Sequence, residues 1–348
     1  MTSQYFEKKK TFYGGRGLFA TKSIPANTLI HTALSPYASV IYREYRKEVC
    51  AYCFAYAFES NRNAWNIRHE KEGSGVWFCS NECKDLWERE ENVEGMVIQM
   101  NISIDQMDRR LKKAQSRAHP ISEGGDQTSL YLSSSHSLDK VITQDFLDST
   151  WRSVESRKGT LEEPLNDLEL DLVRFLTSGL IRRCLEHRSP EQHYDPLDHD
   201  GPPKPNHLHA AGTWSGFLDL QDNELNYIRA EPEVLDRQIR AYIFLRMVAI
   251  PMLKPYVRTA EFVRAILGRD QGNAFGIFEI DGDDMMGVHV TMRCQRTRSP
   301  KSFLFFGQTA LQTSEKIVAD GVFIFTRRQT WKKAKSFVST MWMSKTTF

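Results

Sequence analysis

Four of the six cysteines in this 348-residue chain fall in two close pairs. Cys50 and Cys53 form the first pair, in CAYC, and Cys79 and Cys83 form the second, in FCSNEC. Two such pairs, each placed on a turn or at the start of a helix, can bind one metal ion. Four thiolate ligands fill a tetrahedral site and leave no coordination position for a substrate or water. The spacing therefore predicts a structural zinc site, with four unrelated buried cysteines as the alternative.

The composition favours a reduced intracellular compartment. Six cysteines are too few to form a disulfide scaffold in a chain of this length. No apolar run approaches the roughly 20 residues that span a bilayer, and the first ten residues do not resemble a leader peptide. The net charge of +2 is a poor sign for direct binding to nucleic acid. We expect a nuclear or cytoplasmic protein that contacts no membrane.

The pattern of apolar residues predicts a small β-meander before the cysteines and helices after them. Runs of β type at 17–20, 28–31 and 38–42 are separated by turn signals. Residues from about 114 to 139 are rich in serine and glycine, which indicates a flexible insertion. Helical patterns cover four longer segments: 84–117, 161–188, 232–247 and 259–271. This order indicates an α+β fold rather than a doubly wound sheet.

Apolar side chains recur at helical spacing within these segments. Trp87, Met96 and Met100 are expected to face a core. Two further stripes share this spacing: Leu168, Leu172, Phe175, Leu176 and Leu180, then Leu235, Ile239, Tyr242, Ile243 and Met247. The second stripe belongs to a helix that is predicted to start near Pro232.

A glycine-rich loop precedes the second predicted strand. Gly15, Arg16 and Gly17 belong to GGRGLFA, where glycine lets a ligand approach the main chain closely. A hairpin turn is the commoner explanation of such a loop taken alone. The sequence is not a GxGxxG fingerprint, because no helix of a Rossmann unit is expected to follow it.

The order of these motifs resembles the split SET-domain lysine methyltransferases of the SMYD group and their fungal relatives. GRGLFATKSIPANTLI, then a MYND-like finger, then helices, then ILGRDQGNAFGIFEI cover roughly residues 12–90 and 230–287. The resemblance implies that Gly15, Arg16, Gly17 and Asn273 bind S-adenosylmethionine. It also implies a split SET-type β-fold with an inserted MYND-like zinc finger and helical insertions. The family usually holds a second metal in its finger, but the matching ligands are missing here, so we expect one zinc.

The resemblance also divides the chain into segments. The five expected parts are an N-terminal SET segment (1–49), the finger (50–90), a helical region with flexible insertions (91–230), the SET helical insert with the start of the core SET domain (231–290), and an aberrant tail (291–348).

The tail lacks two motifs of the family, the NHxCxPN segment and the tyrosine that follows GEEL. Both return in part in another reading frame. Back-translation of residues 330–343, read from the third base of the Thr330 codon, permits VEKGEELCVNYVD. The same frame permits SFHFYT from GVFIFT and NCSPN from QTALQT. We interpret the tail as frame-shifted, by a frameshift or retained intron between about Met286 and Phe305.

The predicted function is S-adenosylmethionine-dependent methylation of lysines in histones or other proteins, by a chain whose catalysis is weak or absent as written. No catalytic residue can be named, because the tyrosine of the lysine channel is missing. The alternative is a zinc-finger module that docks a peptide partner without catalysis. A third possibility is nucleic-acid binding through the finger and the basic cluster at 327–335. The near-neutral net charge of the chain argues against it.

Overall fold

The computed structural model divides the chain into two compact units. One comprises Met1–Ala33 with Gln308–Phe348, and the other comprises Leu34–Gly307. We describe each unit by itself. The residues that the structure describes are 6–10, 16–23, 29–31, 36–70, 75–118, 142–157, 159–161, 163–188, 213–273 and 311–312.

The first unit contains two pairs of antiparallel strands. β1 pairs with β2, and Phe6 lies opposite Ala20. β3 pairs with β6, with a shift in register along β3. The strands of these pairs are β1 (Phe6–Lys10), β2 (Arg16–Ala20), β3 (Leu29–His31) and β6 (Leu311–Gln312). The strands predicted at 17–20 and 28–31 are confirmed; each starts one residue away from its predicted start and ends at the predicted residue.

The third predicted strand, at 38–42, is wrong. This segment is a mostly buried loop of the second unit, and its backbone is held by side chains of α4 (Asp167–Arg188). The N–H of Ser39 donates to Ser178 Oγ at 3.1 Å, and the N–H of Arg43 donates to Asp171 Oδ2 at 3.0 Å. Helix side chains thus satisfy backbone groups that a strand would have paired with a neighbour.

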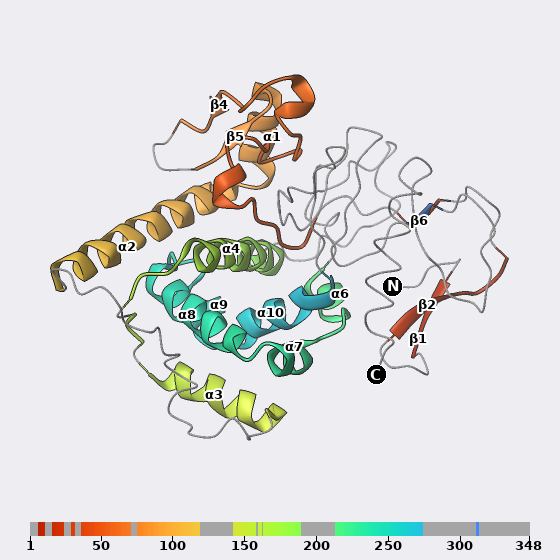
Figure 1. Cartoon of the computed structure of the whole chain (residues 1–348). Coiled ribbons are helices and arrows are strands. Elements are labelled where there is room, and N and C mark those ends of the chain that lie inside the picture. The colour runs from red at the N-terminus through yellow and green to blue at the C-terminus, as the bar shows by residue number, and fades with distance from the viewer. Residues whose placement is uncertain are drawn as a thin grey trace, which may run out of the picture. The chain divides into compact units, whose positions relative to one another are not determined.

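The second unit is a helical body that carries the cysteine module (Figure 1). Within this body α4 packs against α2, α8 and α10, and α10 also contacts α7 and α9. No helix in the described part of the chain combines the length and apolarity that a membrane span requires. The further helices of the body are α2 (Met96–Ala118), α3 (Gln144–Ser156), α6 (Trp214–Leu218), α7 (Glu224–Ala230), α8 (Glu233–Val248), α9 (Lys254–Val257) and α10 (Glu261–Asn273).

The two predicted apolar stripes form much of the core of this body. The first four residues of the α8 stripe are buried, and Met247 is half-buried. In α4, Phe175, Leu176 and Leu180 are buried as predicted and Leu172 is half-buried, but Leu168 is 62% exposed, whereas Leu170 of the same turn is buried. Gly179 lets α4 approach α10 closely, since a Cβ there would lie 2.8 Å from Ile266 Cδ1. Helical periodicity therefore predicts part of what α4 and α8 contribute to this core.

The predicted helical segment 84–117 is two helices rather than one. α1 (Asn81–Glu90) and α2 are separated by a short 3₁₀ turn, Val93–Gly95. Glu94 and Gly95 have positive φ angles of 55° and 70°, which an α-helix does not accommodate. Trp87, Met96 and Met100 lie on either side of the break and are buried as predicted. The break lets α1 bury Trp87 in the core of the finger and lets α2 bury Met96 and Met100 in the core of the helical body.

Candidate metal centre and cofactor residues

The four predicted ligands converge on one point. The Sγ atoms of Cys50, Cys53, Cys79 and Cys83 all lie within 4.8 Å of one another. The Cys53–Cys79 and Cys79–Cys83 sulfur distances are both 3.5 Å. Tetrahedral bonds of about 2.3 Å from zinc to sulfur place neighbouring sulfurs about 3.8 Å apart. The cluster therefore has nearly the size that one zinc ion requires.

A tight turn presents the first pair. The N–H of Cys50 donates to the carbonyl of Ala55, and the N–H of Phe54 donates to the carbonyl of Cys50 at 2.9 Å. Phe54 adopts a positive φ of 61°, and a β-bridge between Val49 and Tyr56 closes the turn. The strained residue right after Cys53 reverses the chain, so both thiols point to the same side.

A strand and a helix start present the second pair. Cys79 follows β5 (Trp77–Phe78), which pairs with β4 (Ile67–Arg68). Ser80 caps α1, and its Oγ accepts a hydrogen bond from the N–H of Cys83 at 3.1 Å. Cys83 thus lies in the first turn of a helix, four residues after Cys79.

Contacts among the sulfurs shift their acidity. Hydrogen bonds from Cys50 and then Cys53 lower the pKa of Cys79 to about 4. A hydrogen bond with Cys53 also lowers the pKa of Cys50, and bonds with Cys50 raise the pKa of Cys53 and Cys83. These contacts favour the thiolate form at Cys50 and Cys79, and the thiolate is the form in which cysteine binds a metal. A set of four sulfur donors selects zinc or another thiophilic ion.

The module around this site has a small apolar core of its own. Trp65, Phe78 and Trp87 are buried beside the cysteines, together with Ile98 of α2. The rings of Phe78 and Trp87 meet edge to face with centroids 5.5 Å apart, and Trp65 Nε1 donates to the carbonyl of Ala55. This core joins the finger to the helical body. Because it contains few residues, we expect a bound metal to contribute much of the stability of the finger.

His69 lies outside the sulfur cluster. Its Nε2 is 2.7 Å from Glu88 Oε1, and Glu88 Oε2 accepts a hydrogen bond from Asn92 Nδ2. Asn92 Oδ1 in turn accepts from the N–H of Ile98. In the part of the chain that the structure describes, the four cysteines alone form a group of three or more possible ligands. His69 therefore belongs to a chain of hydrogen bonds that runs through Glu88 and Asn92 and joins α1 to the start of α2, and it is not part of the sulfur cluster.

Replacement of His69 tests this assignment. We expect His69→Ala to keep one zinc per chain and to lose about 1 kcal/mol of stability, because one hydrogen-bonded pair is removed. Cys83→Ser is the matched comparison and should lose the metal. Inductively coupled plasma mass spectrometry measures zinc per chain, and urea unfolding measures stability. Loss of zinc from the His69→Ala protein would show that the histidine is a ligand.

The predicted cofactor residues are only partly described. Gly15 lies outside the described residues, whereas Arg16 and Gly17 are the first two residues of β2 and pair with β1. Asn273 is the last residue of α10, and its Nδ2 donates to the carbonyls of Gln221 and Arg269 at 2.9 and 2.8 Å. These residues belong to different units. Their assignment as a common site stays a prediction.

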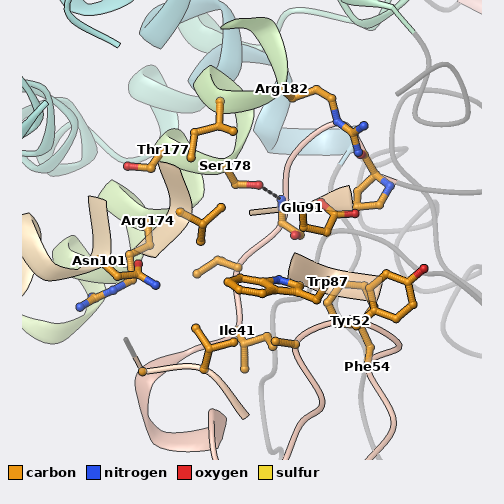
Figure 2. Close-up of a pocket in the computed structure, with 18 of the residues that line it drawn as sticks. Ile41, Tyr52, Phe54, Trp87, Glu91, Asn101, Arg174, Thr177, Ser178 and Arg182 are labelled. Carbon is orange, nitrogen blue, oxygen red and sulfur yellow. Dashed lines mark hydrogen bonds between the residues drawn. The ribbon is translucent and has the colours of Figure 1, made fainter. Parts of the chain in front are cut away.

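Sequence reasoning missed a group of charged residues beside the finger. Arg46, Asp171 and Arg174 lie close together in the second unit, and the two arginines line a pocket (Figure 2). The one signal in the sequence is a pair of opposite charges three residues apart inside the strongly apolar stretch 168–181. Buried charges at such positions are rare unless they are paired.

Comparison with known proteins gives two relatives. A protein of Saccharomyces cerevisiae described as "Potential protein lysine methyltransferase SET6" is 27% identical over 314 aligned residues, which cover 80% of this chain and 72% of that protein. A SET and MYND domain-containing protein of Dictyostelium discoideum is 32% identical over 80 residues, 23% of this chain and 14% of that protein. No family model matches the chain. The chain is therefore a homologue of SET-domain and SET-and-MYND proteins, and its cysteine cluster fits a MYND-like zinc finger.

Proposed function

We propose that the chain is a SET-type protein-lysine methyltransferase that uses S-adenosylmethionine, with lysines of histones or other proteins as substrates. The observation that carries the proposal is the similarity to the yeast protein, because it extends over 80% of this chain. The sulfur cluster supports it as the expected finger of such a protein. A nuclear or cytoplasmic location belongs to the same proposal.

The proposed architecture is a split SET domain. Residues 1–49 and 231–290 would form its two parts, with the finger (50–90) and the helical region (91–230) inserted between them. The β1–β2 hairpin supports this arrangement, because it carries Arg16 and Gly17 directly after the glycine loop. Residues 291–348 would contribute the remaining strands only in the alternative reading frame.

S-adenosylmethionine supplies a methyl group activated on a sulfonium, so little acid–base chemistry is needed from the protein. Its main task is to hold a deprotonated lysine amine in line with that methyl group. The glycines next to Arg16 would let the cofactor approach the main chain. Asn273 would receive a donor group of the cofactor, since its hydrogen bonds to described residues use Nδ2 and Oδ1 can act as an acceptor.

Two substitutions of Asn273 test the cofactor assignment. We expect Asn273→Ala to weaken binding of S-adenosylmethionine about tenfold, because a hydrogen bond of about 1.4 kcal/mol is lost. Asn273→Asp keeps the acceptor oxygen and should bind within threefold of the original chain. Equilibrium dialysis with radiolabelled cofactor measures both constants.

The comparison of the two variants separates binding from folding. Both lose the Nδ2 bonds to Gln221 and Arg269, and the carboxylate of Asn273→Asp also faces these two carbonyl oxygens, so damage to the end of α10 is at least as large in that variant. Equal losses of affinity would indicate a structural role for Asn273. Absence of cofactor binding by the unaltered chain would favour the alternative function, a finger that docks a partner without catalysis.

A further inference from the structure

The C-terminal end of α2 has no buried face. Earlier in the helix, Met100 and Ile104 are buried, and Met107 and Leu111 are half-buried against the same core. From 112 to 117, in contrast, every residue is exposed. Figure 1 shows this end of α2 extending past the other helices of the body. Packing against the body therefore does not explain the sequence of these last turns.

The same end of α2 is strongly basic. Five of the nine residues 109–117 are arginine or lysine, and none is acidic. The whole chain has a net charge of only +2, because acidic residues elsewhere balance its other cations. The near-neutral net charge argues against nucleic acid for the chain as a whole, but it does not describe this segment.

Most of these cations share one side of the helix. At 3.6 residues per turn, four of them fall within an arc of about 100° on the side away from Ile104 and Leu111. All four are exposed. We call them the basic stripe, which consists of Arg109, Arg110, Lys113 and Arg117.

No carboxylate in the described part of the chain forms an ion pair with the basic stripe. Arg109 Nε donates to the backbone carbonyl of Asp105 at 3.1 Å, which leaves its charge uncompensated. The neighbouring Lys112 differs, since its Nζ lies 2.8 Å from the carboxylate of Asp108. The stripe thus presents four positive charges to its surroundings.

The stability of the helix does not account for the basic stripe. A cation in the last turn is favoured by the helix dipole, and Arg117 lies in that turn. Arg109 and Arg110 lie about two turns earlier, where this effect has faded. Like charges three or four residues apart, such as those of Arg109 and Lys113, destabilise a helix. An anionic partner would remove this repulsion.

The shape and composition of this end of α2 favour duplex DNA over other anionic partners. An α-helix with its side chains is about 10–12 Å across, and the major groove of B-DNA is about 12 Å wide. The major groove of duplex RNA is too narrow. Residues 105–117 contain no aromatic ring on which a single strand could stack. The stripe also contains no apolar residue to insert into a membrane or to anchor an acidic peptide.

We propose that the basic stripe of α2 binds phosphates of duplex DNA without reading the base sequence. Each of its four cations would replace counterions at a phosphate. Phosphate contacts position a protein on DNA but carry no direct sequence information. This binding would be independent of S-adenosylmethionine and of methyl transfer, so it does not rest on the proposed function.

Fluorescence anisotropy of the zinc-loaded full chain with a labelled duplex tests the proposal. Affinity would be measured between about 50 and 200 mM salt for the original chain and for the combined variant Arg110→Gln, Lys113→Gln and Arg117→Gln. The slope of log K against log salt should be flatter by about 2.7 in the variant, because three phosphate contacts are lost. Affinity at the lower salt concentration should fall at least tenfold. The basic cluster at 327–335 is present in both chains, so it does not cause a difference between them.

Two control variants separate charge from folding. Arg110→Lys combined with Arg117→Lys keeps the positive charges and should bind within threefold of the original chain. Arg152→Gln removes an exposed cation of α3 whose Nε donates to the carbonyl of Asp148 at 3.1 Å, the same kind of bond that Arg109 makes. It should leave affinity and slope unchanged. Zinc content and far-ultraviolet circular dichroism check that all variants are folded.

Four outcomes would overturn the proposal. The first is an unchanged affinity and slope in the glutamine variant. The second is an equal loss in the lysine variant, which would show that the stripe acts through the fold of the helix rather than through its charge. The third is equally tight binding of duplex RNA, and the fourth is equally tight binding of polyglutamate, since either would identify a different partner.

Discussion

Removal of zinc should unfold the finger and leave the helical body folded. Structural zinc sites of this kind contribute about 10 kcal/mol or more to folding. Among the described residues, the core of the finger is a small cluster whose buried rings are those of Tyr52, Trp65, Phe78 and Trp87, and it cannot replace so large a contribution. The helical body has its own extensive buried core, centred on α4 and α8, and does not depend on the cluster.

Hydrogen exchange before and after treatment with a strong chelator measures this result. Backbone amides in 50–90 should lose their protection, whereas those in the middle of α8 should keep it. Cys184→Ser is the matched control, since Cys184 is buried outside the cluster and its Sγ donates to the carbonyl of Met252. That variant should keep its zinc and the protection of the finger. Protection in 50–90 that survives complete loss of zinc would show that the metal is dispensable.

The convergence of the four cysteines could be predicted from the sequence because the chemistry is local. Each pair lies within one turn or one helix start, so its spacing alone places two thiols on the same side. The helices α8 and α10 could be predicted for a similar reason. Their apolar residues repeat at helical spacing, and this repeat depends only on the chain itself.

Features that depend on distant residues could not be predicted. The segment 38–42 has the composition of a strand, but Ser178 and Asp171 of α4 take up its neighbouring backbone N–H groups. Leu168 matches the apolar stripe of α4, yet in the first turn Leu170 is buried and Leu168 is exposed. In both places the tertiary environment overrides the local pattern.

The charged pocket has the same origin. Arg46 and Arg174 are far apart in the sequence, and only the fold brings both to Asp171. Sequence alone shows that charged residues interrupt an apolar helix, but it does not show which partner meets them. Asn273 is an intermediate case, because its place at the end of α10 follows from the helical pattern while its bond to Gln221 does not.

The interpretation of the tail has the largest consequence for activity. In the alternative frame, residues 308–343 permit NCSPN, SFHFYT and VEKGEELCVNYVD, in the order of the missing SET motifs. Apart from β6, this segment lies outside the described residues. We expect the chain as written to transfer methyl groups at least 100-fold more slowly than a chain rebuilt in the alternative frame from the Gln308 codon onward. This ratio corresponds to about 2.7 kcal/mol of transition-state stabilisation.

Two controls accompany the rebuilt chain. Replacement of the tyrosine in its VNYVD segment by phenylalanine should abolish most of the regained activity, because this tyrosine would line the lysine channel. The spliced transcript provides an independent control. A message that encodes KKAKSFVSTMWM in frame and without interruption would refute the frameshift.

The most direct test of the proposed function is methyl transfer by the rebuilt, zinc-loaded chain. It would be incubated with S-adenosylmethionine and a broad panel of histones, and tandem mass spectrometry would locate added methyl groups. We expect methylation of specific lysines by the rebuilt chain and little or none by the chain as written. A rebuilt chain that is folded, holds zinc and methylates no lysine in the panel would contradict the assignment.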